Sequence, residues 1–538
     1  MRYLVNLLII CEKLMKLPEL SIHPKGELEK PKEKSNYLSN CTENFDRLSV
    51  ETFGGRVHVE WDPTSSVTPL GQLAFFIEFL KVGHLFDPWV DDCPLYFSSN
   101  NAPTKREVLG TLLLSILSGH RRYAHVTGIR NDGVNPGLLG IDKLVSEDSL
   151  RRALLRIIEV EGITWLQKHL EKCYAPLLEV PWVLDVDTTV KVLYGKQEGA
   201  VVGYNPKKPG RPSHTYHTYS LANLRLILDV EVQPGNQMAA KYTAPDLWSL
   251  LDRIPSTHWP QFIRGDCAFG TDGVMNAAEE KGVPYLFKLK LTKNIKRLIE
   301  RLMLNQEWAS AGQIWEGQES VIQLQGWDKS RRVIVLRKRV NQDLLAVTED
   351  TETKQLKLNF AELDNKTAIY EYAVLVTSLQ DEVVTIAQHY RDRADSENVF
   401  DELKNQWGWG GFTTQDLSRC RLVARAVGLI YNWWNLFVRL ADPNKHLEAI
   451  TSRPLLLNAI GKQTTHAGQT FIKITSTHGR TETVRWFLGR ITTFFKSLKT
   501  DAEQLTGEQR WYRILSKAVE KYLQGRQLQP PIYMPLAT

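Results

Sequence analysis

The chain has 538 residues, more than a single hydrophobic core usually holds, so several packed units are expected. Hydrophobic residues make up 43% of it and charged residues 24%, which excludes a fibrous or broadly disordered protein. The 67 Lys and Arg residues against 61 Asp and Glu residues give a net charge of +6, which permits a polyanionic partner without requiring one.

The cysteines and the apolar runs of the sequence indicate the cellular compartment of the protein. The six cysteines form no C-x-x-C pair, so we expect reduced thiols rather than zinc fingers or a disulfide framework. The apolar run 4–11 is too short to span a bilayer, and no small-residue cleavage site follows it. We interpret residues 1–45 as an N-terminal extension or linker in preference to a signal peptide. No other stretch suits a membrane, so a cytoplasmic location is predicted.

Residues 46–176 are predicted to form a helical region. The segment 105–119 has helical apolar spacing, ends at Gly119 and is followed by His-Arg-Arg. The segment 146–157 begins at a capping Ser146 and carries two arginines in its first turns. Short helices with basic N-termini are typical of a helix-turn-helix that binds DNA, so we expect a DNA-binding region. A plain helical bundle with solvated arginines fits equally well.

Strands and helices then alternate, which indicates an α/β domain. The predicted strands are 182–193, 221–232, 259–267 and 283–291, with helices at 244–254 and 272–282. Short strands with turns follow, which predicts an all-β insertion. A strong helical pattern resumes at Val383 and runs past Lys404. The resulting division is 177–307 for the first part of the core, 308–379 for the insertion, 380–440 for the rest of the core and 441–538 for a helical C-terminal region.

The helix from Val383 carries the most informative motif. In a continuous α-helix, Tyr390, Arg393, Glu397 and Lys404 fall within about a 60° arc. The carboxylate can bind a metal ion, and the cations and the phenol can hold phosphate oxygens. The alternative is a solvated charged face with a weak i,i+4 ion pair. Against it, the spacing Tyr-x2-Arg-x3-Glu-x6-Lys should arise by chance in only about a few chains per thousand of this length.

This spacing resembles that of bacterial insertion-sequence transposases with an RNase H-like Asp-Asp-Glu core. The order of the segments is similar too, over roughly residues 50 to 500. The resemblance implies an α/β fold: an RNase H-like catalytic core with an inserted all-β subdomain, flanked by mostly helical regions. In the family the first Asp ends the first core strand before Thr-Thr, which is Asp187 here, and the second closes the fourth core strand, which is Asp266 in RGDCAFG. Glu397 is then the third carboxylate.

Two further aspartates leave this assignment open. Asp185 points to the same face of its strand as Asp187 and could be mistaken for it. Asp272 follows Asp266 closely, and we interpret it as a helix N-cap. A lone Asp at a strand end is usually a turn or cap residue, and the presence of Glu397 on its motif helix is what favours the catalytic interpretation.

The resemblance implies a transposase that cuts the inverted-repeat ends of an insertion sequence and transfers the strands into target DNA. Asp187, Asp266 and Glu397 are implied to be catalytic and to hold Mg²⁺, with Mn²⁺ as a substitute. Mg²⁺ prefers oxygen ligands, and two such ions serve an in-line displacement at phosphorus. The implied partners are double-stranded DNA and a second copy of the chain, which together bind the paired ends of the element. The implied location is the nucleoid.

Several residues are expected to contact DNA. By resemblance, Tyr390, Arg393 and Lys404 hold the terminal phosphate. The Pro/Gly-rich loop 203–214 lies beside the strand of the first Asp and is positioned to meet a DNA backbone, with solvated loop charges as the alternative. Its cations are Lys207, Lys208 and Arg211.

Tryptophans occur in two informative places. Many family members pass through a DNA hairpin and stack a flipped base on a tryptophan of the insertion. Trp308, Trp315 and Trp327 are candidates here, and packing of small sheets explains each equally well. In NQWGWGGF (405–412) we interpret the glycines as a helix stop and the tryptophans as core residues.

Two rival functions remain. One is an inactive transposase-derived DNA-binding protein, which the intact carboxylates and Lys404 disfavour. The other is a different RNase H-like nuclease, which the Tyr-Arg-Glu-Lys helix and the preceding β insertion disfavour.

Overall fold

The structure is a computed structural model that describes residues 47–238, 240–304, 307–340, 362–363, 369–476, 479–500 and 505–530. Two compact units divide the chain, Met1–Ser65 and Ser66–Thr538. In the first unit, β1 (Arg47–Thr52) and β2 (Gly55–Glu60) form an antiparallel hairpin. The extension predicted over residues 1–45 lies outside the described residues.

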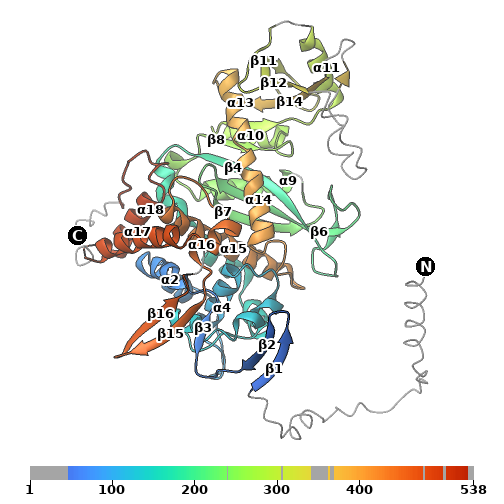
Figure 1. Ribbon diagram of the computed structural model, residues 1–538. Helices are drawn as coiled ribbons and strands as arrows, with labels where there is room; N and C mark the ends of the chain where they lie inside the picture. The colour runs from blue at the N-terminus through green and yellow to red at the C-terminus, as the bar shows by residue number, and fades with distance from the viewer. Residues whose placement is uncertain are drawn as a thin grey trace, which may run out of the picture. The chain divides into compact units, whose positions relative to one another are not determined.

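A mixed sheet forms the centre of the second unit (Figure 1). Its middle strands follow the order β7-β6-β4-β8-β9, in which β6 is antiparallel to both β4 and β7, while β8 is parallel to β4 and β9 is parallel to β8. Three antiparallel strands followed by two parallel ones are the RNase H-like arrangement, so the predicted fold class is confirmed. The strands are β4 (Val183–Val192), β6 (Pro212–Leu221), β7 (Leu226–Pro234), β8 (Phe262–Gly265) and β9 (Tyr285–Lys288), with β5 (Val201–Val202) at the edge of β6.

One strand of this core was not predicted. The strand expected over 221–232 corresponds to β7 and the turn before it, in which Asn223 and Arg225 have φ of +65° and +55°; β6, which precedes this turn and pairs with β7, was not expected. β6 is rich in His, Thr, Tyr and Ser, yet it is buried along almost its whole length. Because both faces are covered, it lacks the polar–apolar alternation by which a half-exposed strand is recognised.

The insertion continues the core sheet. Its strands are antiparallel, and β14 pairs with β9, so one 11-stranded sheet runs through both parts. The elements are α11 (Lys293–Met303), β10 (Ala309–Ser310), β11 (Trp315–Ile322), β12 (Arg331–Val340), β13 (Glu362–Leu363) and β14 (Ile369–Thr377).

Helices from both ends of the unit share one hydrophobic core. At its centre is α15 (Leu417–Ala441), which is buried on nearly every side and packs against β7 and α8. Helix α4 begins at a capping box of Thr104 and Glu107, and Ser146 caps α7 as predicted. The N-terminal helices are α2 (Leu73–Val82), α3 (Phe86–Asp91), α4 (Lys105–Leu117), α5 (Val126–Ile129), α6 (Asn135–Leu138), α7 (Glu147–Leu155) and α8 (Glu159–Tyr174).

The C-terminal region contains a hairpin as well as helices. β15 (Gly461–His466) and β16 (Gln469–Ile474) pair with β3 (Ser66–Thr68) in a three-stranded sheet. The sequence analysis expected only helices here, because this exposed hairpin has no buried face to leave an apolar pattern. The helices are α16 (Ala449–Leu456), α17 (Thr481–Thr500) and α18 (Gly507–Ala518). Among the described helices, none has both the length and the apolar character required to cross a bilayer.

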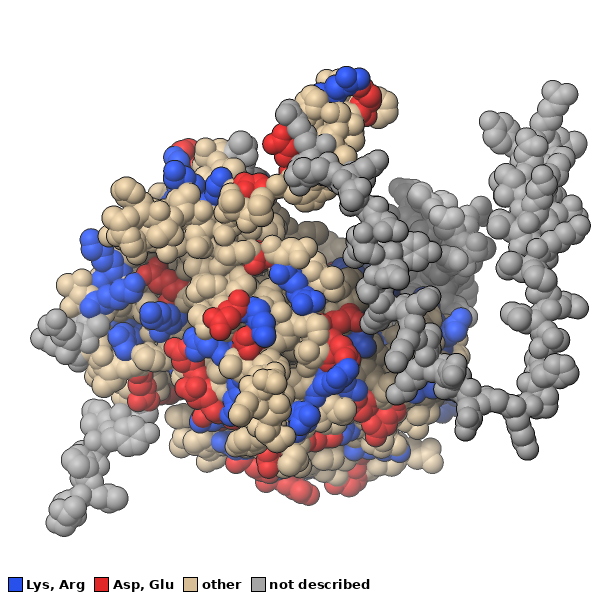
Figure 2. Space-filling view, turned by 90° about the horizontal axis from the view of Figure 1, so that it is seen from below, with Lys and Arg blue, Asp and Glu red and all other residues tan. Residues whose placement is uncertain are grey.

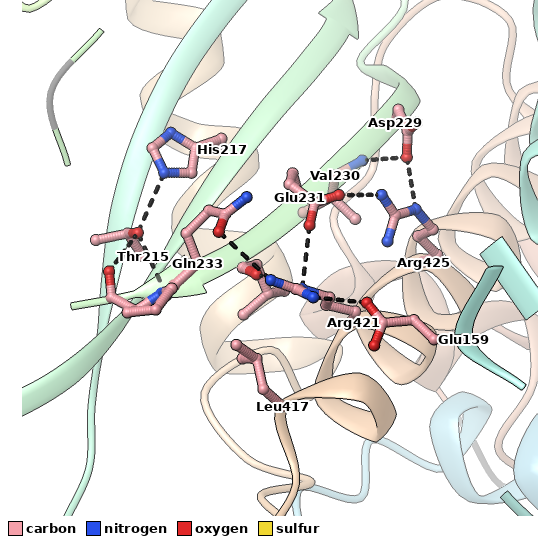
Figure 3. A network of polar contacts seen from close by, with 12 residues as sticks. Glu159, Thr215, His217, Asp229, Val230, Glu231, Gln233, Leu417, Arg421 and Arg425 are labelled. Atoms are coloured by element: carbon pink, nitrogen blue, oxygen red, sulfur yellow. Dashed lines mark hydrogen bonds and ion pairs between the residues drawn. The ribbon is translucent and has the colours of Figure 1, made fainter. Parts of the chain in front are cut away.

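An ion-pair network fastens α15 to the outer core strand β7 (Figure 3). Arg425 donates to Asp229 at 2.8 Å and to Glu231, and Arg421 bridges Glu231 and Glu159 of α8. Arg425 is almost fully buried, so its charge is tolerable only because two carboxylates compensate it. The network fixes β7 beside β6, on the side of the sheet opposite the insertion.

Candidate active site

Asp187 lies on β4 and is largely buried, with 13% of its side chain exposed. Its Oδ1 accepts a hydrogen bond of 2.7 Å from the Thr188 backbone N–H, and its Oδ2 is paired with Arg393. Burial raises the pKa of Asp187 to about 7, against the opposing charge of Arg393 and with help from the negative charges of Asp266 and Glu397. The three predicted carboxylates therefore interact electrostatically, although they are far apart in sequence.

Asp266 reaches this place through the parallel pairing of β4 and β8. Val186 is in register with Gly265, so Asp187 and Asp266 each follow directly on a paired residue of neighbouring strands. Asp187 lies in the middle of β4, which continues to Val192, and not at its end as the resemblance implied. Because neighbouring strands lie about 4.8 Å apart, this position is beside the end of β8, which brings the two side chains together. The Asp266 carboxylate also accepts a hydrogen bond of 2.9 Å from the Ala268 N–H, which closes the turn after β8.

The motif helix is broken in two. The sequence predicted one helix through Tyr390 and Lys404, but α13 (Val383–Arg391) ends before Arg393 and α14 (Ala394–Gln406) begins after it (Figure 1). The common 60° arc predicted for the four motif residues therefore does not hold. The reason is packing, because the two helices bury their apolar faces in different hydrophobic clusters. Ile386 and Ala387 of α13 pack with β8, β9 and β14, whereas Val399 and Leu403 of α14 join the main core.

The break turns Arg393 inward. Its side chain is only 9% exposed and lies between Asp187 and Glu397, whose Oε1 is 3.3 Å from Nη1. Glu397 itself is 71% exposed, so burial does not fix its carboxylate. Within the described residues, no three His, Cys, Asp or Glu side chains are arranged to ligate one metal ion. The cation that joins the carboxylates in this structure is the guanidinium of Arg393.

The two ambiguous aspartates are engaged elsewhere. Asp185 is buried and receives two hydrogen bonds from the equally buried Arg264, one of them 2.7 Å long from Nη2. Asp272 pairs with Arg331 at 2.7 Å in the first turn of α10 (Asp272–Glu280). The prediction that Asp272 is the N-cap was wrong, because the extended residue before the helix is Thr271.

The predicted cations divide into two groups. Burial lowers the pKa of Lys404, and the charge of Lys207 lowers it further, whereas Asp187 opposes this shift. The loop 203–211 thus brings Lys207 to α14 and to the carboxylates. Lys208 and Arg211 gather instead around Tyr194 at the end of β4, with their charged groups 5.3 and 5.7 Å from its ring centre.

Tyr390 of α13 is partly buried beside the same charges. Burial raises its pKa to about 12, with Arg393 opposing and Asp266 adding to the shift. The phenol is therefore protonated at neutral pH and can donate a hydrogen bond to an anion. It belongs with Asp187, Asp266, Arg393 and Glu397 in one electrostatically coupled group.

The sequence analysis missed two lysines at the end of β9. The charges of Lys290 and Lys288 act on Cys267, whose thiol pKa burial and the neighbouring Asp266 raise. Both lysines therefore lie near the second predicted carboxylate. Their i,i+2 spacing at the end of a predicted strand places them on one face, which is the signal that could have identified them.

The tryptophans pack rather than project. Each candidate of the insertion is half-buried with a cation over its ring: Arg337 at 4.0 Å from Trp308, Lys338 at 5.7 Å from Trp315 and Arg331 at 5.2 Å from Trp327. None is singled out for stacking on a base. The tryptophans of 405–412, Trp407 and Trp409, are fully buried, which confirms the prediction that they are core residues.

Comparison with known proteins identifies the family of this chain. Residues 105–494 match the family model described as transposase DDE domain group 1. No curated protein matches the chain. Among solved structures, the cryo-EM structure of a piggyBac transposase synaptic complex with hairpin DNA matches with 10% identity and a TM-score of 0.35, over 88% of this chain and 89% of that chain, a similarity too low to support inference. Because the family model covers well over half of the chain, the protein belongs to the DDE transposases of this group.

Proposed function

We propose that this protein is an active, metal-dependent transposase of a bacterial insertion sequence. It cuts DNA at the inverted-repeat ends of its element and joins the ends to target DNA, as a homodimer on paired ends. The observation that carries the proposal is the electrostatic interaction of Asp187, Asp266 and Glu397, which come from the middle of β4, the end of β8 and helix α14. Membership in the transposase family supports the same reaction.

The donor set suits Mg²⁺, with Mn²⁺ as a substitute. All three side chains offer carboxylate oxygens, the ligands that Mg²⁺ prefers. Burial raises the pKa of Asp187, and the charges of Asp266 and Glu397 add to the shift, so a divalent cation would stabilise the ionised carboxylate. When bound, two such ions activate the attacking water or 3′-hydroxyl and neutralise the leaving oxygen. Arg393 now pairs with Asp187, so metal binding competes with that ion pair.

The remaining residues act on the phosphate. Lys404 and Lys207 supply two neighbouring positive charges that bind the non-bridging oxygens of the scissile phosphate and orient it toward the carboxylates. Tyr390 stays protonated and donates its phenolic hydrogen to another phosphate oxygen. Arg393, when it leaves Asp187, can bind the phosphate as a planar, bidentate donor. Positioning and charge neutralisation are the protein's main contributions to such a reaction.

The test uses a duplex made from the inverted repeats that flank the gene. Glu397→Gln keeps the shape of the side chain and the basic surface but removes one negative ligand. We expect this variant to bind the duplex as the parent does and neither to nick nor to join it in Mg²⁺ or Mn²⁺. Asp401→Asn removes the same charge from an exposed position on the same helix and serves as the matched control, with cutting retained.

Three outcomes discriminate the alternatives. Cutting by Glu397→Gln at the parent's rate would exclude Glu397 as a ligand. A parent protein that binds but never cuts with either metal is the inactive DNA-binding derivative. A parent that cuts without joining and without preference for the repeat ends is a different RNase H-like nuclease.

A further inference from the structure

One short segment near the C-terminus carries a strong excess of positive charge. Of the 67 Lys and Arg residues and 61 Asp and Glu residues, seven and one fall within residues 461–500, which leaves 60 of each elsewhere. This segment forms β15, β16 and α17. The face in Figure 2 shows basic and acidic side chains intermixed, so the local excess matters more than the total. Arg485 pairs with Glu482 and Lys499 pairs with Glu78, so part of this charge is compensated. The seven cations are Lys462, Lys473, Arg480, Arg485, Arg490, Lys496 and Lys499.

Helix α17 turns a basic face outward. Its apolar side, with Leu488, Ile491 and Phe495, is buried in the core. On the opposite side, Lys496 is exposed and the side chain of Arg485 is 66% exposed. On the helix face between these two cations the side chains are small, and a Cβ at Gly489 would meet no atom within 4 Å. Small side chains between cations let another backbone approach the helix closely.

An exposed aromatic residue accompanies these charges. Trp486 is 56% exposed, and the guanidinium of Arg490 lies 4.7 Å from its ring centre. Aromatic rings interleaved with Arg and Lys are typical of surfaces that bind nucleic acids.

The hairpin repeats the pattern with a like-charge pair. Lys462 of β15 and Lys473 of β16 are exposed and directly opposite each other in the antiparallel register. Like charges in this position destabilise a hairpin, and a bound polyanion would reverse the effect. A groove of about 940 Å³ separates the hairpin from α17 and is lined by both, including Ile474 and Gly489. The two elements can therefore contact the same ligand.

We infer that β15, β16 and α17 form a second DNA-contact surface, the C-terminal basic surface, which binds the duplex backbone apart from the catalytic carboxylates. The inference rests on the proposed function, since it assigns part of the DNA contact to this surface. A second copy of the chain is disfavoured as the occupant, because a twofold interface would place this net positive face against itself. A duplex offers the complementary charge at about one phosphate per 1.7 Å of axis.

The predicted N-terminal DNA-binding region lacks this excess. Residues 66–176 contain 12 basic and 12 acidic residues. The charge distribution therefore moves the expected backbone contact from the N-terminal helices to the C-terminal basic surface.

The first test introduces a positive, a neutral or a negative side chain at Gly489. Replacement by Lys, Gln or Glu introduces side chains of similar helix propensity into open space, so the three variants should fold alike. Full-length proteins are titrated against a fluorescein-labelled 30-base-pair duplex of arbitrary sequence, in EDTA, by fluorescence anisotropy. We expect Lys to bind more tightly than Gln and Gln more tightly than Glu, by roughly threefold for each unit of charge near 100 mM salt. Equal affinities would overturn the inference.

The second test removes lysines in matched sets. Lys462, Lys473 and Lys496 are changed together to Gln and compared with Lys81, Lys143 and Lys521, which are also exposed. The first set should lower the salt slope of DNA binding by roughly two to three units, and the control set by less than one. Equal losses in the two sets would contradict the inference. So would a change in sedimentation mass with unchanged DNA binding, which would make this face a subunit contact.

Binding in EDTA is independent of cutting, so the two proposals fail separately. If the parent never cuts but the charge order at Gly489 holds, the C-terminal basic surface stands and the proposed activity fails. If the parent cuts but the charge order is absent, only the surface assignment fails.

Discussion

Asp187 makes the stability of the protein depend on pH in a specific direction. Burial raises its pKa from the ordinary value of 3.8 to about 7 in the folded state. Between these values the folded protein holds a proton that the unfolded chain has lost, so stability falls as the pH rises through this window. Asp187→Asn has no proton to lose, so its stability should fall less than that of the parent.

The size of the effect follows from the two pKa values. Ionisation of Asp187 disfavours the folded state by about 2 kcal/mol at pH 5 and about 4 kcal/mol at pH 8. The parent should therefore lose about 2–3 kcal/mol relative to Asp187→Asn between these pH values. Asp187→Asn also alters the contact with Arg393. This alteration is present in the variant at both pH values, so it cancels when the change in stability between pH 5 and pH 8 is compared with that of the parent. For a chain of this length roughly 1 kcal/mol corresponds to one degree, so the relative shift in Tm is about 2–3 °C.

Thermal denaturation followed by tryptophan fluorescence, in EDTA at pH 5 and pH 8, measures this difference. Asp142→Asn removes an exposed carboxylate and is the control, with no relative shift expected. Equal pH dependence of the parent and Asp187→Asn would refute the reasoning, since Arg393 would then compensate fully for burial. A shift of opposite sign would show that the ion pair outweighs burial.

Two further substitutions test the frame of the site. Asp185→Asn leaves the charge of Arg264 buried without a carboxylate, so we expect the free energy of unfolding to fall by about 3–5 kcal/mol. Replacing both residues, by Leu and Met, should cost less. A stable Asp185→Asn protein that cannot cut DNA would instead make Asp185 a metal ligand. Gly411→Ala should strongly lower Tm and soluble yield, because its Cβ would lie 1.7 Å from the Arg121 carbonyl oxygen. Gly489→Ala has open space around it and should stabilise α17 by about 0.5–1 kcal/mol. A harmless Gly411→Ala would mean that the loop after α14 can shift.

The fold class and the candidate carboxylates were implied by the resemblance of local patterns in the sequence to those of a known transposase family. The spacing from Tyr390 to Lys404 lies within one stretch of chain, and apolar runs marked the strands that precede Asp187 and Asp266. Strand β6 could not be predicted in this way. Its His, Thr and Tyr side chains are buried by partners from distant segments, so its pattern carries no sign of burial.

Choosing between Asp185 and Asp187 required the tertiary structure. Both stand on one face of β4, and only the position of Arg264 on the next strand shows that Asp185 is already paired. The break at Arg393 is also a tertiary effect, because α13 and α14 pack into separate hydrophobic clusters. Helical periodicity describes a single rod and contains no information about two separate cores.

The excess of positive charge in residues 461–500 is a property of the sequence alone. That these cations lie on an exposed hairpin and on the outer face of α17 was decided by folding, because the apolar side of α17 is drawn into the core. Sequence therefore determined which residue types were available and their spacing within each element. Contacts between elements determined which charges are compensated inside the protein and which remain at its surface, since compensation depends on neighbours that are distant along the chain.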